Sequence, residues 1–194
     1  MRHDIVVEGE TIRLRPVRVE DAAVMVEIRR SVPEEKLFMN PTSPDPADQR
    51  AYLETYFDRE DDYYFMIERR ADNYAIGCVT ICEIGQVAPG WAEWGRWVLR
   101  PKSNGAVESV WLMFRAGFEI LNLDTLYSRT VVDNEQVVSF HDSCGVKRAC
   151  VLKNYVTLRG KPYDSIEHRL TRAEWSAVEE KLGGMVRRMA RKGK

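Results

Sequence analysis

Apolar and polar residues alternate along several stretches of this chain and recur with a longer period along others. Alternation at every second position predicts strands, and apolar residues spaced three or four apart predict helices. The predicted strands cover residues 11–15, 63–68, 75–84, 91–99, 125–132, 151–158 and 165–170. The predicted helices cover residues 20–30, a segment that begins near Asp45 or Asp48 and ends near Phe57, residues 106–121, residues 134–143 and a segment that begins at residue 171. The order β-α-α-β-β-β-α-β-α-β-β-α predicts an α+β fold, a mixed sheet flanked by helices in three layers, without the alternation of a Rossmann fold.

The segment 106–121 is the most apolar of the predicted helices. Its polar residues Glu108, Arg115 and Glu119 are seven and four positions apart, so they form one narrow stripe on an otherwise apolar cylinder. We therefore expect this helix to be buried against the sheet. Gly145 is expected to end the helix 134–143. The residues from Thr171 onward form a capping-box pattern that opens the last helix.

Composition limits the classes of protein to which the chain can belong. Its 194 residues, 44% of them hydrophobic, suit one globular domain that buries roughly 70% of its unfolded surface. The net charge of −1 argues against a dedicated nucleic-acid binder, which would carry a basic excess. No apolar run approaches the ~20 residues of a membrane span, and the first residues lack the apolar region of a signal peptide. The four cysteines show no zinc-like pairing, so we expect no metal and a reduced, cytoplasmic location.

The loop between the strand 91–99 and the helix 106–121 is the first candidate site. It reads Leu-Arg-Pro-Lys-Ser-Asn-Gly-Ala over residues 99–106. A glycine at such a position lets backbone N–H groups approach an anion at a helix N-terminus. The alternative is a plain connection between a strand and a helix. The glycine-rich signatures of P-loop and dinucleotide-binding proteins are absent.

A second candidate site follows the strand 125–132. Asn134 begins the next predicted helix, and His141 lies seven positions later, near the same helical face. A histidine titrates near neutrality and can pass a proton in either direction. The alternative is structural, with Asn134 as a helix cap and His141 as a surface or packing residue.

These segments resemble the GNAT superfamily of acetyl-coenzyme A dependent N-acetyltransferases. The resemblance runs from the strand at Thr11 to about Leu170 and includes the order of elements. The loop RPKSNGAVES occupies the place of the family's pyrophosphate loop, (Q/R)xxGx(G/A), and VVDNEQVVSFHDSCGV resembles the family's Asn-containing segment. The resemblance implies a mostly antiparallel, twisted sheet in a domain over residues 1–172, followed by a helix and basic tail over residues 173–194. It implies acetyl-CoA as the acyl donor and no metal.

The resemblance also assigns the residues that hold acetyl-CoA. In one register Lys102 and Gly105 match the motif, and in another Asn104 and Ala106 do. Backbone amides from Ser103 to Val107 would hold the pyrophosphate, with charge from Lys102 or Arg100. The strand 91–99 would splay from its neighbour and pair with the pantetheine arm, which Phe140 would contact, while Asn134 would bind the coenzyme or a bridging water. The implied cofactor-binding residues are Val98, Leu99, Arg100, Lys102, Ser103, Asn104, Gly105, Ala106, Val107, Asn134 and Phe140.

Two further residues receive catalytic roles from the resemblance. An amine must be neutral to attack a thioester, so a base or a water relay is required. Glu93, on the strand, is the expected carboxylate; the alternative is a solvated strand residue. His141 stands where the family has a tyrosine, and it is expected to offer a proton to the leaving thiolate. Val146 stands where the family has a phenylalanine.

Selection of the amine falls, in this family, to the first two helices with their connection and to the last hairpin. The strand also carries Trp91, Trp94 and Trp97, and period two predicts that Trp94 faces away from the other two. Aromatic rings beside Glu and Arg suit a sugar or nucleotide; the alternative is that the tryptophans only pack the sheet. The expected substrate-binding residues are Phe38, Asn40, Trp94 and Arg96, and the expected acceptor is an amino sugar or nucleotide amino sugar of surface-glycan synthesis.

Other functions compatible with the sequence are a protein N-terminal acetyltransferase, similar to the ribosomal-protein branch of the superfamily, and a non-catalytic module that binds coenzyme A or a partner. The tail over residues 185–194 carries five basic residues, which would suit a surface-binding protein or a solvated helix end. A small-molecule amine is the expected partner, with no nucleic acid and no membrane span, and a homodimer is possible.

Overall fold

One sheet of eight strands organises residues 2–192, the part of the chain described by this computed structural model. The strands lie in the order β1-β2-β3-β4-β5-β6-β8-β7. Every neighbouring pair is antiparallel except β5 and β6, which are parallel. The bounds are β1 Val7–Glu8, β2 Ile12–Pro16, β3 Tyr63–Arg69, β4 Tyr74–Cys82, β5 Trp91–Leu99, β6 Thr125–Val131, β7 Lys147–Leu158 and β8 Lys161–Thr171. This confirms the mixed, mostly antiparallel sheet expected from the sequence.

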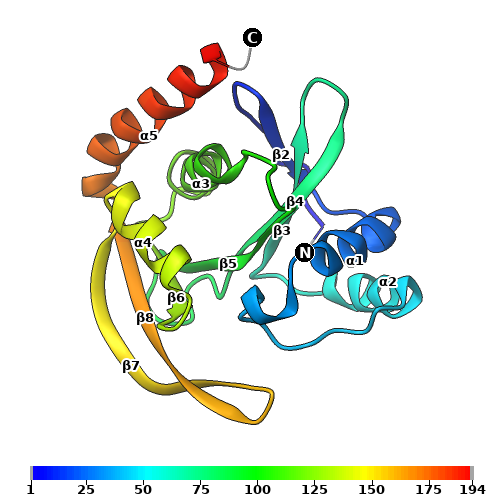
Figure 1. Cartoon of the computed structure of the whole chain (residues 1–194). Coiled ribbons are helices and arrows are strands. Elements are labelled where there is room, and N and C mark those ends of the chain that lie inside the picture. The colour runs from blue at the N-terminus through cyan, green and yellow to red at the C-terminus, as the bar shows by residue number, and fades with distance from the viewer. Residues whose placement is uncertain (1, 193–194) are drawn as a thin grey trace.

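Helices cover both faces of the sheet, as Figure 1 shows. The helices are α1 Ala22–Ser31, α2 Pro46–Tyr56, α3 Ala106–Arg115, α4 Glu135–Cys144 and α5 Arg172–Lys192, with short turns η1 Val19–Asp21, η2 Glu34–Lys36 and η3 Ala116–Ile120. Helices α1 and α2 pack on one face in a core with β3, β4 and β5 side chains. Helices α3 and α5 pack on the other face in a larger core. The predicted order of elements is therefore confirmed from β2 onward, and the short strand β1 precedes it.

Helix α5 runs beside α3 and belongs to the larger core. Near the start of α5, the ring of Trp175 lies 5.9 Å from that of Phe114 near the end of α3. Further along α5, Gly183 lies against Trp111. Because the start of α5 meets the end of α3, the two helices are antiparallel. The segment expected to follow the main domain therefore covers the face of α3 that turns away from the sheet.

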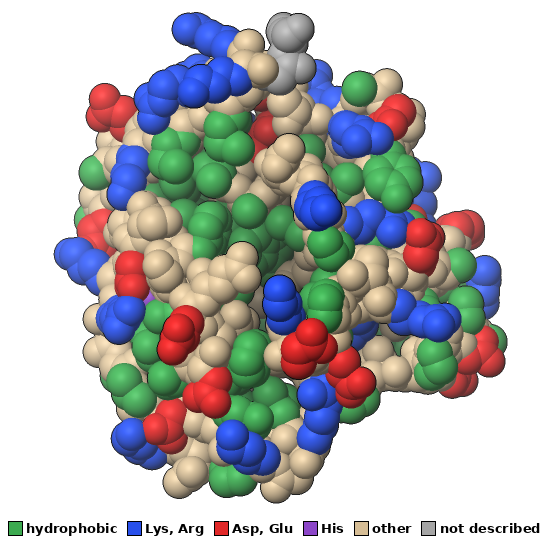
Figure 2. All heavy atoms as spheres, viewed as in Figure 1, with side chains coloured by type: hydrophobic (Ala, Val, Ile, Leu, Met, Phe, Trp, Pro, Cys, Tyr) green, Lys and Arg blue, Asp and Glu red, His purple; other side chains and the backbone are tan. Residues whose placement is uncertain are grey.

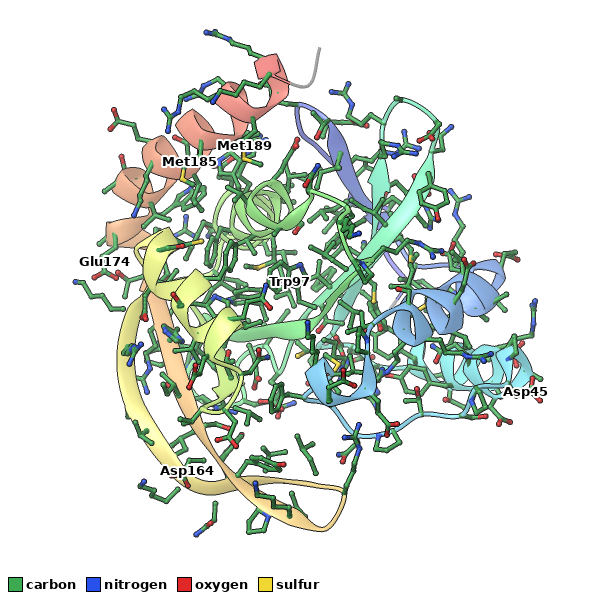
Figure 3. The ribbon with its side chains drawn as sticks, in the orientation of Figure 1. Asp45, Trp97, Asp164, Glu174, Met185 and Met189 are labelled. Carbon is green, nitrogen blue, oxygen red and sulfur yellow. The ribbon has the colours of Figure 1, made fainter. Side chains whose placement is uncertain are left out.

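The expected helix boundaries have recognisable chemical causes. The carboxylate of Asp45, labelled in Figure 3, accepts a hydrogen bond from the Ala47 amide at 2.8 Å and so caps α2. Gly145 ends α4 with a φ of 89°, a conformation that costs glycine little. Glu174 accepts a hydrogen bond from the Thr171 amide at 3.0 Å, half of the predicted capping box.

Three features differ from the predicted elements. Strand β1 has only two residues, too few for a periodic signal. The last hairpin begins at Lys147 and is longer than predicted. The prediction missed the start of β7 because this strand is largely exposed and lacks the alternation of a half-buried strand. The helix predicted to reach residue 121 changes to a π-helix at Ala116, where the Leu121 amide donates to the Ala116 carbonyl at 2.9 Å.

A bulge in β5 changes which tryptophans share a face. The β4–β5 register shifts between Cys78 and Thr80, and Arg96 has a φ of 46°. Such a bulge inserts one residue and reverses the alternation beyond it. The rings of Trp94 and Trp97 therefore lie together, 6.1 Å apart, on the α3 face. The prediction that Trp94 faces away from Trp97 is wrong for this reason.

Candidate active site

The parallel strands β5 and β6 separate after a short paired region. Only Trp91, Ala92 and Glu93 pair with β6, although β5 continues to Leu99 and β6 continues to Val131. The splay expected from the sequence is therefore present. In Figure 2 the surface is hollowed near the centre of this face, and hydrophobic side chains line the hollow. We call the open space between the two strands the seam.

Aromatic rings form one wall of the seam. Trp97 of β5 stacks on Phe140 of α4, with centroids 5.4 Å apart and an angle of 27° between the planes. The Trp97 indole N–H donates to Oγ of Ser109 on α3 at 3.1 Å, which fixes the ring. Figure 3 shows Trp97 between α3 and α4 at the end of β5. Both rings are partly exposed, so they offer an apolar surface to an extended ligand.

The loop that follows β5 leads into the N-terminus of α3. Lys102 and Asn104 have φ values of 64° and 55°, so the backbone turns sharply twice. Gly105 then packs so closely that a Cβ atom there would lie 2.7 Å from Cδ1 of Ile76. The first amides of a helix have no carbonyl of their own helix to bind, and they attract anions. The loop therefore presents donors at the end of the seam.

The two basic residues proposed for the pyrophosphate differ in their surroundings. The Arg100 guanidinium donates to the Ala75 carbonyl and to the Glu27 carboxylate, both at 3.0 Å. Lys102 is exposed and makes no ion pair with any residue that the structure describes. Lys102 is therefore the residue whose charge remains available to a ligand.

Asn134 lies at the start of α4, across the seam from the loop's strand. Its carbonyl accepts from the Val137 and Val138 amides, both at 3.0 Å, but its side chain makes no capping hydrogen bond. The structural alternative, that Asn134 serves as a side-chain cap, is therefore not what the structure shows. The side-chain amide of Asn134 therefore retains its capacity to bind a ligand or water.

Glu93 lies on the face of β5 opposite to Trp94 and Trp97, in a cluster of charged side chains. Nη1 of Arg129 is 3.0 Å from Oε2 of Glu93 and 3.6 Å from Oε2 of Glu83. Nε of the same guanidinium donates to Glu167 at 3.1 Å, and Nη1 donates to the Tyr155 hydroxyl at 2.8 Å. One arginine therefore connects three carboxylates.

The surroundings of Glu93 raise its pKa to about 7. The largest cause is burial, which disfavours the charged form; Arg129 opposes this effect, and Glu83 and Glu167 add to it. The alternative of a solvated strand residue does not fit, because only 20% of the side chain is exposed. A carboxyl group that titrates near neutrality can accept and release a proton at physiological pH.

His141 of α4 is buried against β5 and β8. Its ring lies 5.1 Å from the rings of both Trp94 and His168, and only 2% of the residue is exposed. Burial is the main cause that lowers the pKa of His141 to about 3, and His168 adds to it. The imidazole is therefore neutral at physiological pH, and within residues 2–192 its Nδ1 has no hydrogen-bond partner.

The four expected substrate-binding residues lie in different places. Trp94 is only 2% exposed and packs on Phe114, so it belongs to the core and not to a ligand surface. Arg96 donates to Asp62 at 2.9 Å on the α2 face. Phe38 contacts the ring of Tyr163, and the Asn40 carbonyl accepts from Arg29 at 3.0 Å, so both lie in the α1–α2 connection.

Two neighbouring cavities lie where this connection meets the end of the β7–β8 hairpin. The first, of about 450 Å³, is lined by the end of α1, the connection and Arg159. The second, of about 250 Å³, is lined by the connection and by residues from both sides of the hairpin turn. Neither lining includes Glu93 or Arg96. Figure 1 shows the hairpin curving away from the sheet toward the connection.

The order of elements, the seam and the loop at α3 agree with a comparison against protein families. The model of the acetyltransferase (GNAT) domain matches residues 11–147. The chain belongs to this acetyltransferase family. It is thereby an acyltransferase, whose acetyl donor in this family is acetyl-CoA.

Solved structures of other acetyltransferases share the fold. Apo FdhC, described as a nucleotide-linked sugar GNAT, has 22% identity and a TM-score of 0.77, with 95% of this chain and 99% of that chain covered. A GCN5-related N-acetyltransferase from Brucella melitensis has 18% identity and a TM-score of 0.80, with coverage of 94% and 86%. A chimera of the spermidine N-acetyltransferase SpeG from Vibrio cholerae and hSSAT has 17% identity and a TM-score of 0.75, with coverage of 86% and 98%. No curated protein sequence matches the chain.

Several residues near the site carry no signal in the sequence of this acetyltransferase. Arg129 and Glu167 lie on strands with ordinary half-buried alternation. Glu83 directly follows β4, which ends at Cys82 although the predicted strand continued to residue 84. Their meeting depends on the pairing of β6 with β8, which a single sequence does not define. Among the described residues, no group of three or more His, Cys, Asp or Glu side chains could hold a metal ion, and no helix is long and apolar enough to span a membrane.

Proposed function

We propose that this acetyltransferase moves an acetyl group from acetyl-CoA to the primary amine of an amino sugar, free or nucleotide-linked. The observation that carries the catalytic part is the buried carboxyl group of Glu93, whose pKa is raised to about 7 on a strand that borders the open seam. The acceptor class is supported by a fold shared with a nucleotide-linked sugar acetyltransferase and by cavities at the α1–α2 connection.

The residues along the seam suit acetyl-CoA. The edge of β5 that turns away from β4, over Val98 and Leu99, would pair with the amides of the pantetheine arm, and Phe140 with Trp97 would contact its apolar part. The Arg100 amide is already bonded to the Ile76 carbonyl of β4 at 2.7 Å. The amides of Asn104, Gly105, Ala106 and Val107 would hold the pyrophosphate, with charge from Lys102. The Ser103 amide already donates to the Arg100 carbonyl at 3.2 Å. The Asn134 side chain would bind the coenzyme or a water. When bound, acetyl-CoA supplies an acetyl group that is activated as a thioester.

Glu93 would act as the base for the acceptor. An amine is protonated at neutral pH and cannot attack a carbonyl carbon until it loses that proton. The Glu93 carboxylate would take the proton, directly or through a water, and Arg129 would hold the carboxylate in place. The new C–N bond then forms as the C–S bond breaks. The nitrogen, which becomes cationic on attack, releases its second proton, and the thiolate takes up that proton directly or through water. His141 would support this last step as a neutral hydrogen-bond donor, because its imidazolium form is not populated at neutral pH.

The release of free thiol from acetyl-CoA tests this function. The acceptor panel comprises amino sugars, nucleotide amino sugars, N-terminal peptides and spermidine, and we expect the sugars to react fastest. Acetyl-CoA alone should raise the melting temperature, since at 100 times its Kd the stabilisation is ~2.7 kcal/mol. Fastest reaction with peptides or spermidine would contradict the acceptor class. Binding without thiol release from any amine would favour a non-catalytic coenzyme A module.

A further inference from the structure

The cavity of about 450 Å³ at the end of α1 is rich in arginine. Arg29, Arg30 and Arg159 line it, and Glu34 is the only carboxylate among its lining residues. The remaining lining is mostly apolar and includes Val26, Leu37 and Met39. Positive charge beside an apolar wall suits a ligand that carries an anionic group next to a flat or apolar body.

The arginines are only partly satisfied by the protein. Arg29 donates through Nη2 to the Asn40 carbonyl at 3.0 Å, but its buried Nε has no hydrogen-bond partner among the residues that the structure describes. Neither Arg29 nor Arg30 forms an ion pair with a residue that the structure describes. A buried N–H donor without an acceptor destabilises the protein, and an anionic ligand that accepts its hydrogen bond would recover that loss.

Arg159 is held by an ion pair at the border of the cavity. Its Nη2 lies 3.1 Å from Oε1 of Glu34 and 3.1 Å from the Glu34 carbonyl oxygen. Both side chains are exposed, Glu34 by 76%, so the pair is weak and a stronger anion can replace the carboxylate. Glu34 and Arg159 also line the second cavity, which contains the rings of Phe38 and Tyr163. The pair therefore separates an arginine-rich space from an aromatic one.

We infer that this arginine cavity binds the diphosphate of a nucleotide-linked acceptor, with Arg29, Arg30 and Arg159 as the phosphate ligands. The inference rests on the proposed function and specifies its acceptor. Guanidinium groups bind phosphate oxygens in pairs of parallel hydrogen bonds. The oxygens of a diphosphate can pair in this way with several arginines, whereas a single carboxylate on the acceptor can pair fully with only one. A polyamine acceptor is disfavoured, because its cationic groups would meet the same three arginines.

Uridine diphosphate serves as the probe, titrated calorimetrically into the whole protein with coenzyme A present at saturation. We expect binding, a loss of affinity of about tenfold or more in Arg30→Gln and in Arg159→Gln, and a Kd that rises with salt. Arg50→Gln is the matched control, since Arg50 is exposed on α2 and outside both cavities. The affinity of Arg50→Gln for uridine diphosphate should equal that of the natural protein. Circular dichroism of each variant confirms that it is folded.

Four outcomes would overturn the inference. They are no binding of uridine diphosphate, equal affinity in the two cavity variants and the control, equal affinity for uridine, and binding that occurs only in a parallel titration without coenzyme A, which would place the probe in the donor site. The titration does not depend on turnover. If thiol is released with amino sugars while the titration fails, the proposed function stands and the arginine cavity does not bind phosphate. If no amine reacts while the titration succeeds, the cavity inference stands and the acetyl transfer does not.

Discussion

The guanidinium of Arg129 bridges Glu93 and Glu167, which lie on different strands, with distances of 3.0 Å and 3.1 Å. The sequence separates Glu93 from Glu167 by most of the second half of the chain, and β6 between them carries the arginine. The positive charge of Arg129 thus holds the Glu93 carboxylate and opposes the effect of burial on its pKa. This arrangement gives the carboxyl group a defined position as well as a pKa near neutrality.

Glu93→Gln should lower kcat/KM for the true acceptor by ~10²–10⁴-fold, because the variant keeps the size of the side chain but cannot accept a proton. The ascending limb of the pH profile should change as well, since part of it reports the carboxyl group with a pKa of about 7. Steady-state kinetics from pH 5 to pH 9 measure both effects. An unchanged rate and profile would assign proton removal to solvent or to another group.

The same substitution should change the pH dependence of stability. Unfolded Glu93 releases its proton near pH 4.5, whereas the folded protein releases it near pH 7. Between these values the folded state holds the additional proton, so rising pH favours unfolding. Relative to the natural protein, Glu93→Gln should gain on the order of 1–3 kcal/mol between pH 5 and pH 8. Urea unfolding at both pH values measures the difference, and an equal difference at both would argue against the raised pKa.

His141 should make the fold sensitive to acid. Its pKa is lowered by burial to about 3, while in the unfolded chain it is near 6.5, so the unfolded state binds more protons as pH falls below 6.5. His141→Phe removes that proton uptake and keeps an aromatic ring beside Trp94. Relative to the natural protein, the variant should gain about 2 kcal/mol between pH 7.5 and pH 5. Thermal unfolding followed at the two pH values gives the comparison. If both proteins lose the same stability between pH 7.5 and pH 5, His141 is not buried in its neutral form.

Gly77→Ala should destabilise the protein at the edge of the seam. A Cβ atom at Gly77 would lie 2.4 Å from the Val98 carbonyl oxygen, so the backbone of β5 would have to move. We expect a loss of about 1–3 kcal/mol and weaker binding of acetyl-CoA. Gly184→Ala is the matched control: its Cβ would meet only the end of the Arg188 side chain, so the helix should gain about 0.5–1 kcal/mol. A stable Gly77→Ala variant with normal acetyl-CoA affinity would contradict this account of the seam.

Much of the fold could be predicted from periodicity, because the strands and helices that bury one face carry the corresponding pattern. The π-helical end of the segment 106–121 could not, since its residues continue a helical pattern without interruption. The β5 bulge was also invisible, although it decides that Trp94 and Trp97 share a face. Glu93 and the loop at Gly105 could be named because a family motif and a strand position identify them. The arginine cavity could not, because Arg30 and Arg159 line the same cavity only where the long hairpin curves toward the α1–α2 connection.

The seam turns β5 and β6 into edge strands in the interior of a sheet. Edge strands expose unpaired N–H and C=O groups that invite pairing with other extended chains, and natural proteins usually protect them at the outer border. Here each strand is followed by a helix, α3 or α4, and the Trp97–Phe140 stack stands beside the opening. The helices restrict access to a narrow molecule that can lie along one strand. The fold thus keeps unpaired backbone N–H and C=O groups available to a ligand. It also lowers the risk of aggregation that such unpaired groups carry at the outer border of a sheet.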